Sequence, residues 1–110
     1  MFELLRMAED VGAKPLLVVS AGCTTADTCA TGDAVQPFVQ DALDAIEFVT
    51  GPASNTAWGS KRALAGRPEP YELEAFAIGN ENCHARSAQG YAANWLRIAK
   101  AVQKASTETI

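Results

Sequence analysis

The residues of this chain best placed for chemistry are Asn80 and Glu81, in the segment AIGNENC at positions 77–83. An apolar run, Leu73 to Ile78, leads into them, and a polar stretch follows. A carboxylate at the point where a strand ends and a loop begins lies where α/β proteins place their catalytic groups. From position alone, Glu81 is either such a catalytic carboxylate or an ordinary loop glutamate.

The cysteines give no metal-binding pattern. Cys23, Cys29 and Cys83, together with one histidine, are enough ligands on paper, but their spacing fits no zinc finger or ribbon. We therefore predict no metal site. Unrelated thiols are favoured over a zinc site, and the sequence leaves open whether Cys23 and Cys29 form a disulfide across one loop.

Composition excludes several classes of partner. The 110 residues correspond to about one small domain, with nine basic and 13 acidic side chains and a net charge of −4. Because no cluster of Lys and Arg is present, nucleic acid is not expected as a partner. The apolar runs are too short to span a bilayer, so no membrane is expected. The first residues lack a signal-peptide pattern and read as the middle of a helix, which indicates a truncated chain.

Hydrophobic periodicity predicts alternating helices and strands. The continuous apolar run at 15–20 suits a strand covered on both faces. In the last helix, Tyr91, Trp95, Ile98 and Val102 are expected to form one buried face. The predicted elements are a helix at 2–11, a strand at 15–20, a helix at 34–49 capped by Asp33, a short helix near 60–65, a strand at 73–78 and a helix at 89–105.

This order implies parallel strands joined by crossover helices. Two strands alone offer little surface for three amphipathic helices and leave both sheet edges open. The fold class predicted is therefore α/β, as a partial (β/α)8 TIM barrel of about two βα units. A whole barrel needs about 250 residues, so residues 1–110 are interpreted as a fragment of one catalytic domain.

Five stretches in order resemble the α-L-arabinofuranosidases of glycoside hydrolase family 51, in the version with Ala77 and Cys83 that is typical of plant and other eukaryotic members. Gly-Asn-Glu alone is a weak match, whereas the ordered series covers nearly the whole chain. The stretches are Leu5–Gly12 (LRMAEDVG), Pro15–Gly22 (PLLVVSAG), Pro37–Gly51 (PFVQDALDAIEFVTG), Trp58–Tyr71 (WGSKRALAGRPEPY) and Ala77–Cys83 (AIGNENC).

The resemblance implies specific roles. The family's retaining glycosidases carry an Asn-Glu pair at the end of the fourth barrel strand. On that mapping, 15–20 is the third strand and 73–78 the fourth. Glu81 then matches the general acid/base, and Asn80 matches the asparagine that binds the sugar 2-hydroxyl.

A retaining enzyme also needs a nucleophilic carboxylate about 5–5.5 Å from the acid/base. The resemblance puts this nucleophile on a seventh strand, beyond Ile110. Glu47, Glu69, Glu72 and Glu74 are not expected to replace it, because they lie on a helix or in the approach to the fourth strand. The 110 residues alone are therefore expected not to hydrolyse arabinofuranosides.

Other side chains have competing interpretations. His84 could tune Glu81 or contact substrate, or be a solvated loop residue. Trp58 could stack on a sugar, or be structural. Arg62 could pair with a carboxylate and brace its loop, or be a surface charge. Arg67 stands where relatives usually have histidine, and no loss of function is expected from it.

The function implied is retaining hydrolysis of terminal α-L-arabinofuranosyl groups, in arabinan or arabinoxylan, without a cofactor. The partner would then be an arabinose-containing polysaccharide or oligosaccharide, and the resemblance favours an extracellular or cell-wall location. The alternatives are a same-clan glycosidase acting on another glycan, such as a β-xylosidase or endoglucanase, and a non-catalytic α/β binding module. The sequence carries no signal for an oligomeric state.

Overall fold

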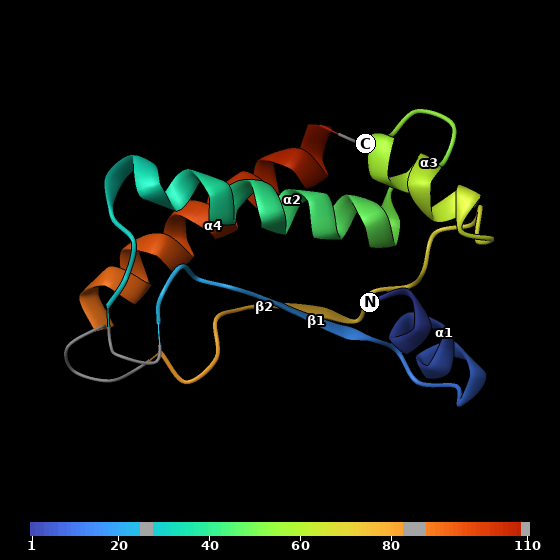
Figure 1. Ribbon diagram of the computed structural model, residues 1–110, viewed down its shortest axis with the longest axis horizontal. Coiled ribbons are helices and arrows are strands. Elements are labelled where there is room, and N and C mark those ends of the chain that lie inside the picture. The colour runs from blue at the N-terminus through green and yellow to red at the C-terminus, as the bar shows by residue number, and fades with distance from the viewer. Residues whose placement is uncertain (25–27, 83–87, 109–110) are drawn as a thin grey trace. The chain divides into compact units, whose positions relative to one another are not determined.

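A computed structural model describes residues 1–24, 28–82 and 88–108 (Figure 1). The elements are α1 (Phe2–Asp10), β1 (Leu16–Val19), the 3-10 helix η1 (Gly32–Val35), α2 (Gln36–Thr50), α3 (Ala57–Leu64), β2 (Ala75–Ile78) and α4 (Ala88–Glu108). The predicted order of helices and strands is confirmed, although α3 begins earlier and β2 later than expected.

Strands β1 and β2 pair in one two-stranded sheet. The N–H of Glu74 donates to Pro15 O at 3.0 Å, and the N–H of Gly79 donates to Val19 O at 2.7 Å. Since donor and acceptor numbers rise together, the strands are parallel and end at the same edge of the sheet. The chain is thus an α/β protein with parallel strands, as predicted.

The chain divides into two compact units. Unit 1 comprises residues 1–17 and 44–76, and unit 2 comprises residues 18–43 and 77–110. Unit 1 contains α1, α3 and the core cluster described next. Unit 2 contains η1, α4 and the ends of both strands, where the candidate catalytic residues lie.

The core of unit 1 gathers around Leu5, Val49 and Tyr71. Phe2 packs edge-on against two rings, with centroid distances of 6.5 Å to Phe48 and 6.4 Å to Tyr71. Edge-to-face packing suits the quadrupoles of these rings. Each strand, helix or loop therefore contributes only one or two side chains to this core, so the core forms only when several segments pack together.

Helix α3 begins earlier than predicted because Thr56 caps it. The Thr56 hydroxyl accepts from the N–H of Gly59 at 3.2 Å and donates to Pro52 O at 2.6 Å. A hydroxyl at this position satisfies an N–H that has no partner within the helix. The preceding turn is thereby joined to the helix start.

Replacing Thr56 by alanine should lower the free energy of unfolding by about 1 kcal/mol, because the N–H of Gly59 loses its partner and the carbonyl of Pro52 keeps only the hydrogen bond from the backbone N–H of Thr56, at 3.2 Å. Urea denaturation of the protein that contains this chain measures the change. Thr56→Ser keeps the hydroxyl and should recover most of the loss. Equal stability of the alanine and serine variants would contradict the capping role.

Arg62 is fully buried, with 0% of its surface exposed. Its guanidinium donates through Nη1 to Phe48 O at 2.8 Å, through Nε to Arg67 O at 3.1 Å and through Nη2 to Pro68 O at 3.0 Å. Arg62 therefore braces the loop, as one interpretation predicted, but its hydrogen bonds go to backbone carbonyls rather than to a carboxylate. The surface-charge interpretation is wrong, because the side chain fills the space between α2 and the 67–68 turn.

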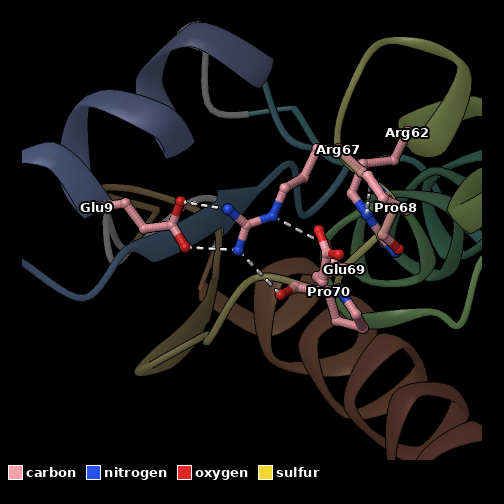
Figure 2. Close-up of polar contacts among 6 residues, drawn as sticks. All are labelled: Glu9, Arg62, Arg67, Pro68, Glu69 and Pro70. Atoms are coloured by element: carbon pink, nitrogen blue, oxygen red, sulfur yellow. Dashed lines mark hydrogen bonds and ion pairs between the residues drawn. The ribbon is translucent and has the colours of Figure 1, made fainter.

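Arg67 holds the same loop from the other side (Figure 2). Its Nη1 and Nη2 form a two-pronged ion pair with Glu9, at 2.7 and 2.6 Å, and its Nε donates to Glu69 O at 3.1 Å. The hydrogen bonds to Glu9 raise the pKa of the Arg67 guanidinium. Arg67 thus ties α1 to the loop that precedes β2.

Two predictions about burial are wrong, the second of them for one residue. Leu16 and Val18 on β1 are 58% and 51% exposed, so the strand is not covered on both faces by the described part of the chain. On α4, Ile98 is fully buried as predicted, but Trp95 is 43% exposed while Asn94 is 3% exposed. The buried stripe of α4 turns toward Asn94 because its amide finds two carbonyl partners there.

Asp33 does not act as the predicted side-chain cap. It lies inside η1, where its backbone carbonyl accepts from the N–H of Gln36, and α2 continues directly from this turn. Among the described residues, no helix has both the length and the apolar character needed to cross a membrane.

Candidate active site

A pocket of about 480 Å³ lies at the ends of both strands in unit 2. One wall continues from β1 and the other continues from β2. Its lining residues are Val18, Val19, Ser20, Ala21, Cys23, Thr24, Gly79, Asn80, Glu81 and Asn82. Because parallel strands end at one edge, the sequence-predicted pair Asn80 and Glu81 is brought to the pocket together.

Glu81 is the one ionisable side chain among these lining residues. It is exposed at the pocket, as is Asn80. Glu81 also has a left-handed backbone, with φ of 54°, the single described non-glycine residue with a positive φ. Such a conformation costs free energy and is concentrated at functional sites. The carboxylate is thus held in a costly backbone geometry at a pocket.

The turn that carries Glu81 depends on Gly79. Gly79 has φ of 79° and no room for a side chain: a Cβ there would lie 2.5 Å from Asn82 Oδ1 and 2.8 Å from Tyr91 Cε2. The N–H of Asn80 donates to Asn82 Oδ1 at 3.0 Å. An asparagine that accepts from the backbone two residues earlier closes a tight turn, and this turn presents Asn80 and Glu81 to the pocket.

The opposite wall is a loop closed by a Cys23–Cys29 disulfide. The disulfide that the sequence left open is therefore present, so these two residues are not unrelated thiols. The N–H of Thr24 donates to Thr28 O at 2.8 Å, which adds a second link across the same loop. The sequence left this pairing open because six residues separate the cysteines and spacing alone does not fix their geometry.

Asn94 on α4 fastens this loop at both ends. Its Nδ2 donates to Ala21 O at 2.9 Å and to Ala30 O at 3.0 Å. The side chain is buried, and the hydrogen bond to Ala21 O is protected from water, while the one to Ala30 O is part-buried. The β1-side wall is consequently held by one covalent link and by a buried amide.

The other glutamates considered above do not line the pocket. Glu47 Oε2 accepts from the N–H of Trp58 at 2.9 Å, and Glu72 and Glu74 lie 3.8 and 3.6 Å from Lys14 Nζ. They belong to unit 1, as does Glu69. The prediction that they do not replace a missing nucleophile agrees with these placements.

Trp58 is not at the pocket either. Lys61 Nζ lies 3.6 Å from the centroid of its ring, so a cation already occupies one aromatic face. This favours the structural interpretation of Trp58 over sugar stacking. His84 and Cys83 lie outside the described residues.

Tyr91 and Asn94 are the supporting residues that the sequence interpretation missed. The Tyr91 hydroxyl donates to Ile78 O, at the end of β2, at 3.0 Å. A signal was present, although the predicted stripe did not include Asn94: this residue stands three positions after Tyr91 and four before Ile98, a spacing that places all three on one helix face. A polar residue on such a stripe indicates a hydrogen bond to backbone that cannot pair otherwise.

The pocket offers a carboxyl group and two amide side chains on one short turn. A carboxyl group at a pocket can donate a proton to a leaving group or accept one from water. A neighbouring amide can bind a hydroxyl through both its N–H groups and its oxygen. Fold and site together define an α/β protein whose candidate chemistry lies at the carboxyl ends of parallel strands.

Comparison with known proteins identifies the family within this class of α/β proteins. A family model described as the α-L-arabinofuranosidase 1 domain matches residues 1–110. Alpha-L-arabinofuranosidase 2 of Arabidopsis thaliana is 45% identical over 104 residues, which cover 94% of this chain. Alpha-L-arabinofuranosidase A of Aspergillus niger is 32% identical over 111 residues, 98% of this chain. The chain belongs to the α-L-arabinofuranosidase family.

A solved structure is also similar. An arabinose-bound GH51 α-L-arabinofuranosidase aligns with a TM-score of 0.88 and 33% sequence identity, over 94% of this chain and 16% of that chain. This chain likewise spans 15% of the length of the Arabidopsis protein and 18% of the Aspergillus protein. The likeness therefore covers nearly all of this chain but a small part of each relative.

Proposed function

We propose that this chain is a central part of the catalytic domain of a retaining α-L-arabinofuranosidase, with Glu81 as the general acid/base. The observation that carries the proposal is the placement of Glu81, in a left-handed turn at the pocket where β1 and β2 end. Family membership supports the reaction class, since the relatives named above are α-L-arabinofuranosidases. Asn80, beside it, is proposed to bind the sugar 2-hydroxyl.

The domain is proposed to be a (β/α)8 barrel, with β1 and β2 as its third and fourth strands and residues 1–110 as one part of it. Among the residues that the structure describes, each strand of the two-stranded sheet has one unpaired edge. Leu16 and Val18 present apolar side chains to solvent. Further barrel strands would pair with the free edges and cover these side chains, as closure of a barrel requires.

Glu81 has two tasks in the proposed reaction. As the glycosidic bond breaks, its protonated carboxyl donates to the departing oxygen, while a second carboxylate captures the anomeric carbon. The Glu81 carboxylate then accepts a proton from water, which attacks the intermediate and releases arabinose with its original configuration. Asn80, one residue away, would hold the 2-hydroxyl through a hydrogen bond that strengthens as charge develops.

The nucleophile is proposed to lie outside these 110 residues. Glu81 is the single carboxylate among the lining residues of the described pocket, and a retaining pair needs its second carboxyl about 5–5.5 Å away. A polypeptide of residues 1–110 alone would therefore lack the covalent step. Arabinan or arabinoxylan side chains are the proposed substrates of the whole protein.

A panel of aryl glycosides tests the reaction class. The full-length protein should hydrolyse 4-nitrophenyl α-L-arabinofuranoside, with kcat/KM at least about 100-fold above its values for β-D-xyloside and β-D-glucoside, because two or more mispaired hydroxyls cost this much. Release of 4-nitrophenol gives the rates. A preference for the xyloside or glucoside would indicate that the protein is a glycosidase acting on another glycan. Binding without turnover would indicate a non-catalytic module.

A further inference from the structure

Tyr91 contacts the peptide unit between Ile78 and Gly79, which shortly precedes the candidate acid/base Glu81 in the chain. The hydroxyl of Tyr91 donates to the carbonyl of Ile78 at 3.0 Å. The N–H of the same peptide unit, that of Gly79, donates to Val19 O at 2.7 Å. Because a peptide unit is planar, fixing both of its polar groups fixes the orientation of the whole plane.

This plane immediately precedes Asn80 and Glu81. A rotation of the plane would change ψ of Ile78 and φ of Gly79, and would swing the turn that follows. Gly79 already has φ of 79°, and Glu81 has φ of 54°. These two left-handed positions flank Asn80, and the one at Glu81, a non-glycine residue, persists only when its surroundings hold it there. The β1 carbonyl holds one side of the plane, and Tyr91 holds the other.

The Tyr91 ring also limits the space beside the turn. A Cβ on Gly79 would lie 2.8 Å from Tyr91 Cε2 and 3.1 Å from the Cβ of Ala21. The ring therefore packs directly against the glycine, while its hydroxyl reaches the carbonyl one residue earlier. The ring contact acts on Gly79 and the hydrogen bond acts on Ile78, so the Tyr91 side chain controls both the position and the tilt of the turn.

We propose that Tyr91 is a positioning residue for Glu81: by holding the Ile78–Gly79 peptide plane, it aims the carboxyl group at the leaving-group oxygen. This inference rests on the proposed function, because it assigns Tyr91 a role in the proton-donation step. A carboxyl displaced by a fraction of an ångström donates its proton less effectively to an oxygen that is a poor leaving group.

The test is Tyr91→Phe in the full-length protein, with two substrates. The substitution removes the hydroxyl and keeps the ring, so the packing against Gly79 remains. For an arabino-oligosaccharide, whose leaving group needs a proton, kcat/KM should fall about 10-fold. For 2,4-dinitrophenyl α-L-arabinofuranoside, whose leaving group departs unprotonated, kcat/KM should change less than about 2-fold.

Asn94→Leu is the matched control. It lies one helical turn further along α4 and removes hydrogen bonds to Ala21 O and Ala30 O, which belong to the opposite wall. Loosening that wall should lower kcat/KM for both substrates by a similar factor. The thermal unfolding temperature of each variant measures how much general stability is lost.

The selective loss in Tyr91→Phe would support the positioning role. An equal loss on both substrates, or no loss on the oligosaccharide, would overturn it. Glu81→Gln is assayed alongside: if it too lacks a leaving-group-dependent loss, the proposed function itself fails. If Glu81→Gln has that loss and Tyr91→Phe does not, the positioning role alone is wrong.

Discussion

Glu81→Gln is expected to lower kcat/KM of the full-length protein for arabino-oligosaccharides by about 10²–10⁴-fold, the usual contribution of a general acid or base. Glutamine has nearly the shape of glutamate and keeps the turn at the end of β2, but it has no proton to give to the departing oxygen. The loss should shrink with 2,4-dinitrophenyl arabinofuranoside, because that leaving group departs without protonation. Steady-state kinetics on both substrates measure the two effects.

Glu72→Gln is the matched control for this substitution. Glu72 is 84% exposed, belongs to unit 1 and does not line the pocket. Its replacement should leave both rates within about 2-fold of the unsubstituted protein, since surface substitutions away from special features have small effects. A loss in Glu81→Gln that is the same for both substrates would point to a binding or structural role for Glu81.

Arg62→Leu is expected to destabilise the protein by about 3–5 kcal/mol, because three hydrogen bonds from a charged group, each worth about 1.5–3 kcal/mol, are lost and water offsets part of the loss. The guanidinium pairs three carbonyls, those of Phe48, Arg67 and Pro68, from two separate segments. Leucine removes this donor from all three part-buried hydrogen bonds. The midpoint of urea unfolding measures the loss.

Lys61→Leu, at the adjacent position, provides the comparison. Lys61 is exposed, and its main contact is with the ring of Trp58. Its removal should cost about 0.5–1 kcal/mol, the value of an exposed cation–π contact. Arg62→Lys should fall between the two, because one ammonium cannot reach three carbonyls in the guanidinium geometry. Similar stabilities of Arg62→Leu and Lys61→Leu would contradict the bracing role.

The positions of Glu81 and of both strands could be predicted because they follow local patterns. The apolar run before Gly79 indicates a strand, and the polar residues after it indicate a turn. Parallel pairing then follows from the intervening helices. No contact between distant residues is needed to place Glu81 at a strand end.

The environments of Arg62 and Asn94 could not be predicted in the same way. Each side chain is buried because carbonyls from distant segments meet around it: Phe48, Arg67 and Pro68 in one case, Ala21 and Ala30 in the other. Periodicity identifies which positions of a helix face inward, but it does not show which backbone groups those side chains will contact. A single sequence carries little information about such contacts between distant segments.

The exposure of β1 has another cause. A continuous apolar run predicts cover on both faces, yet Leu16 and Val18 remain exposed in the described chain. The pattern is a property of the strand, whereas the cover depends on neighbours that residues 1–24, 28–82 and 88–108 do not supply. This difference is what the barrel proposal explains.

The configuration of an azide product tests the role of Glu81 most directly. In full-length Glu81→Ala, an activated aryl α-L-arabinofuranoside can still form the glycosyl-enzyme intermediate, and azide can replace the water that Glu81 no longer activates. Azide attacks the face opposite the nucleophile, so we predict faster turnover with azide and an α-L-arabinofuranosyl azide, identified by NMR. A β-configured azide would make Glu81 the nucleophile instead, and the absence of any azide effect would contradict a general acid/base role.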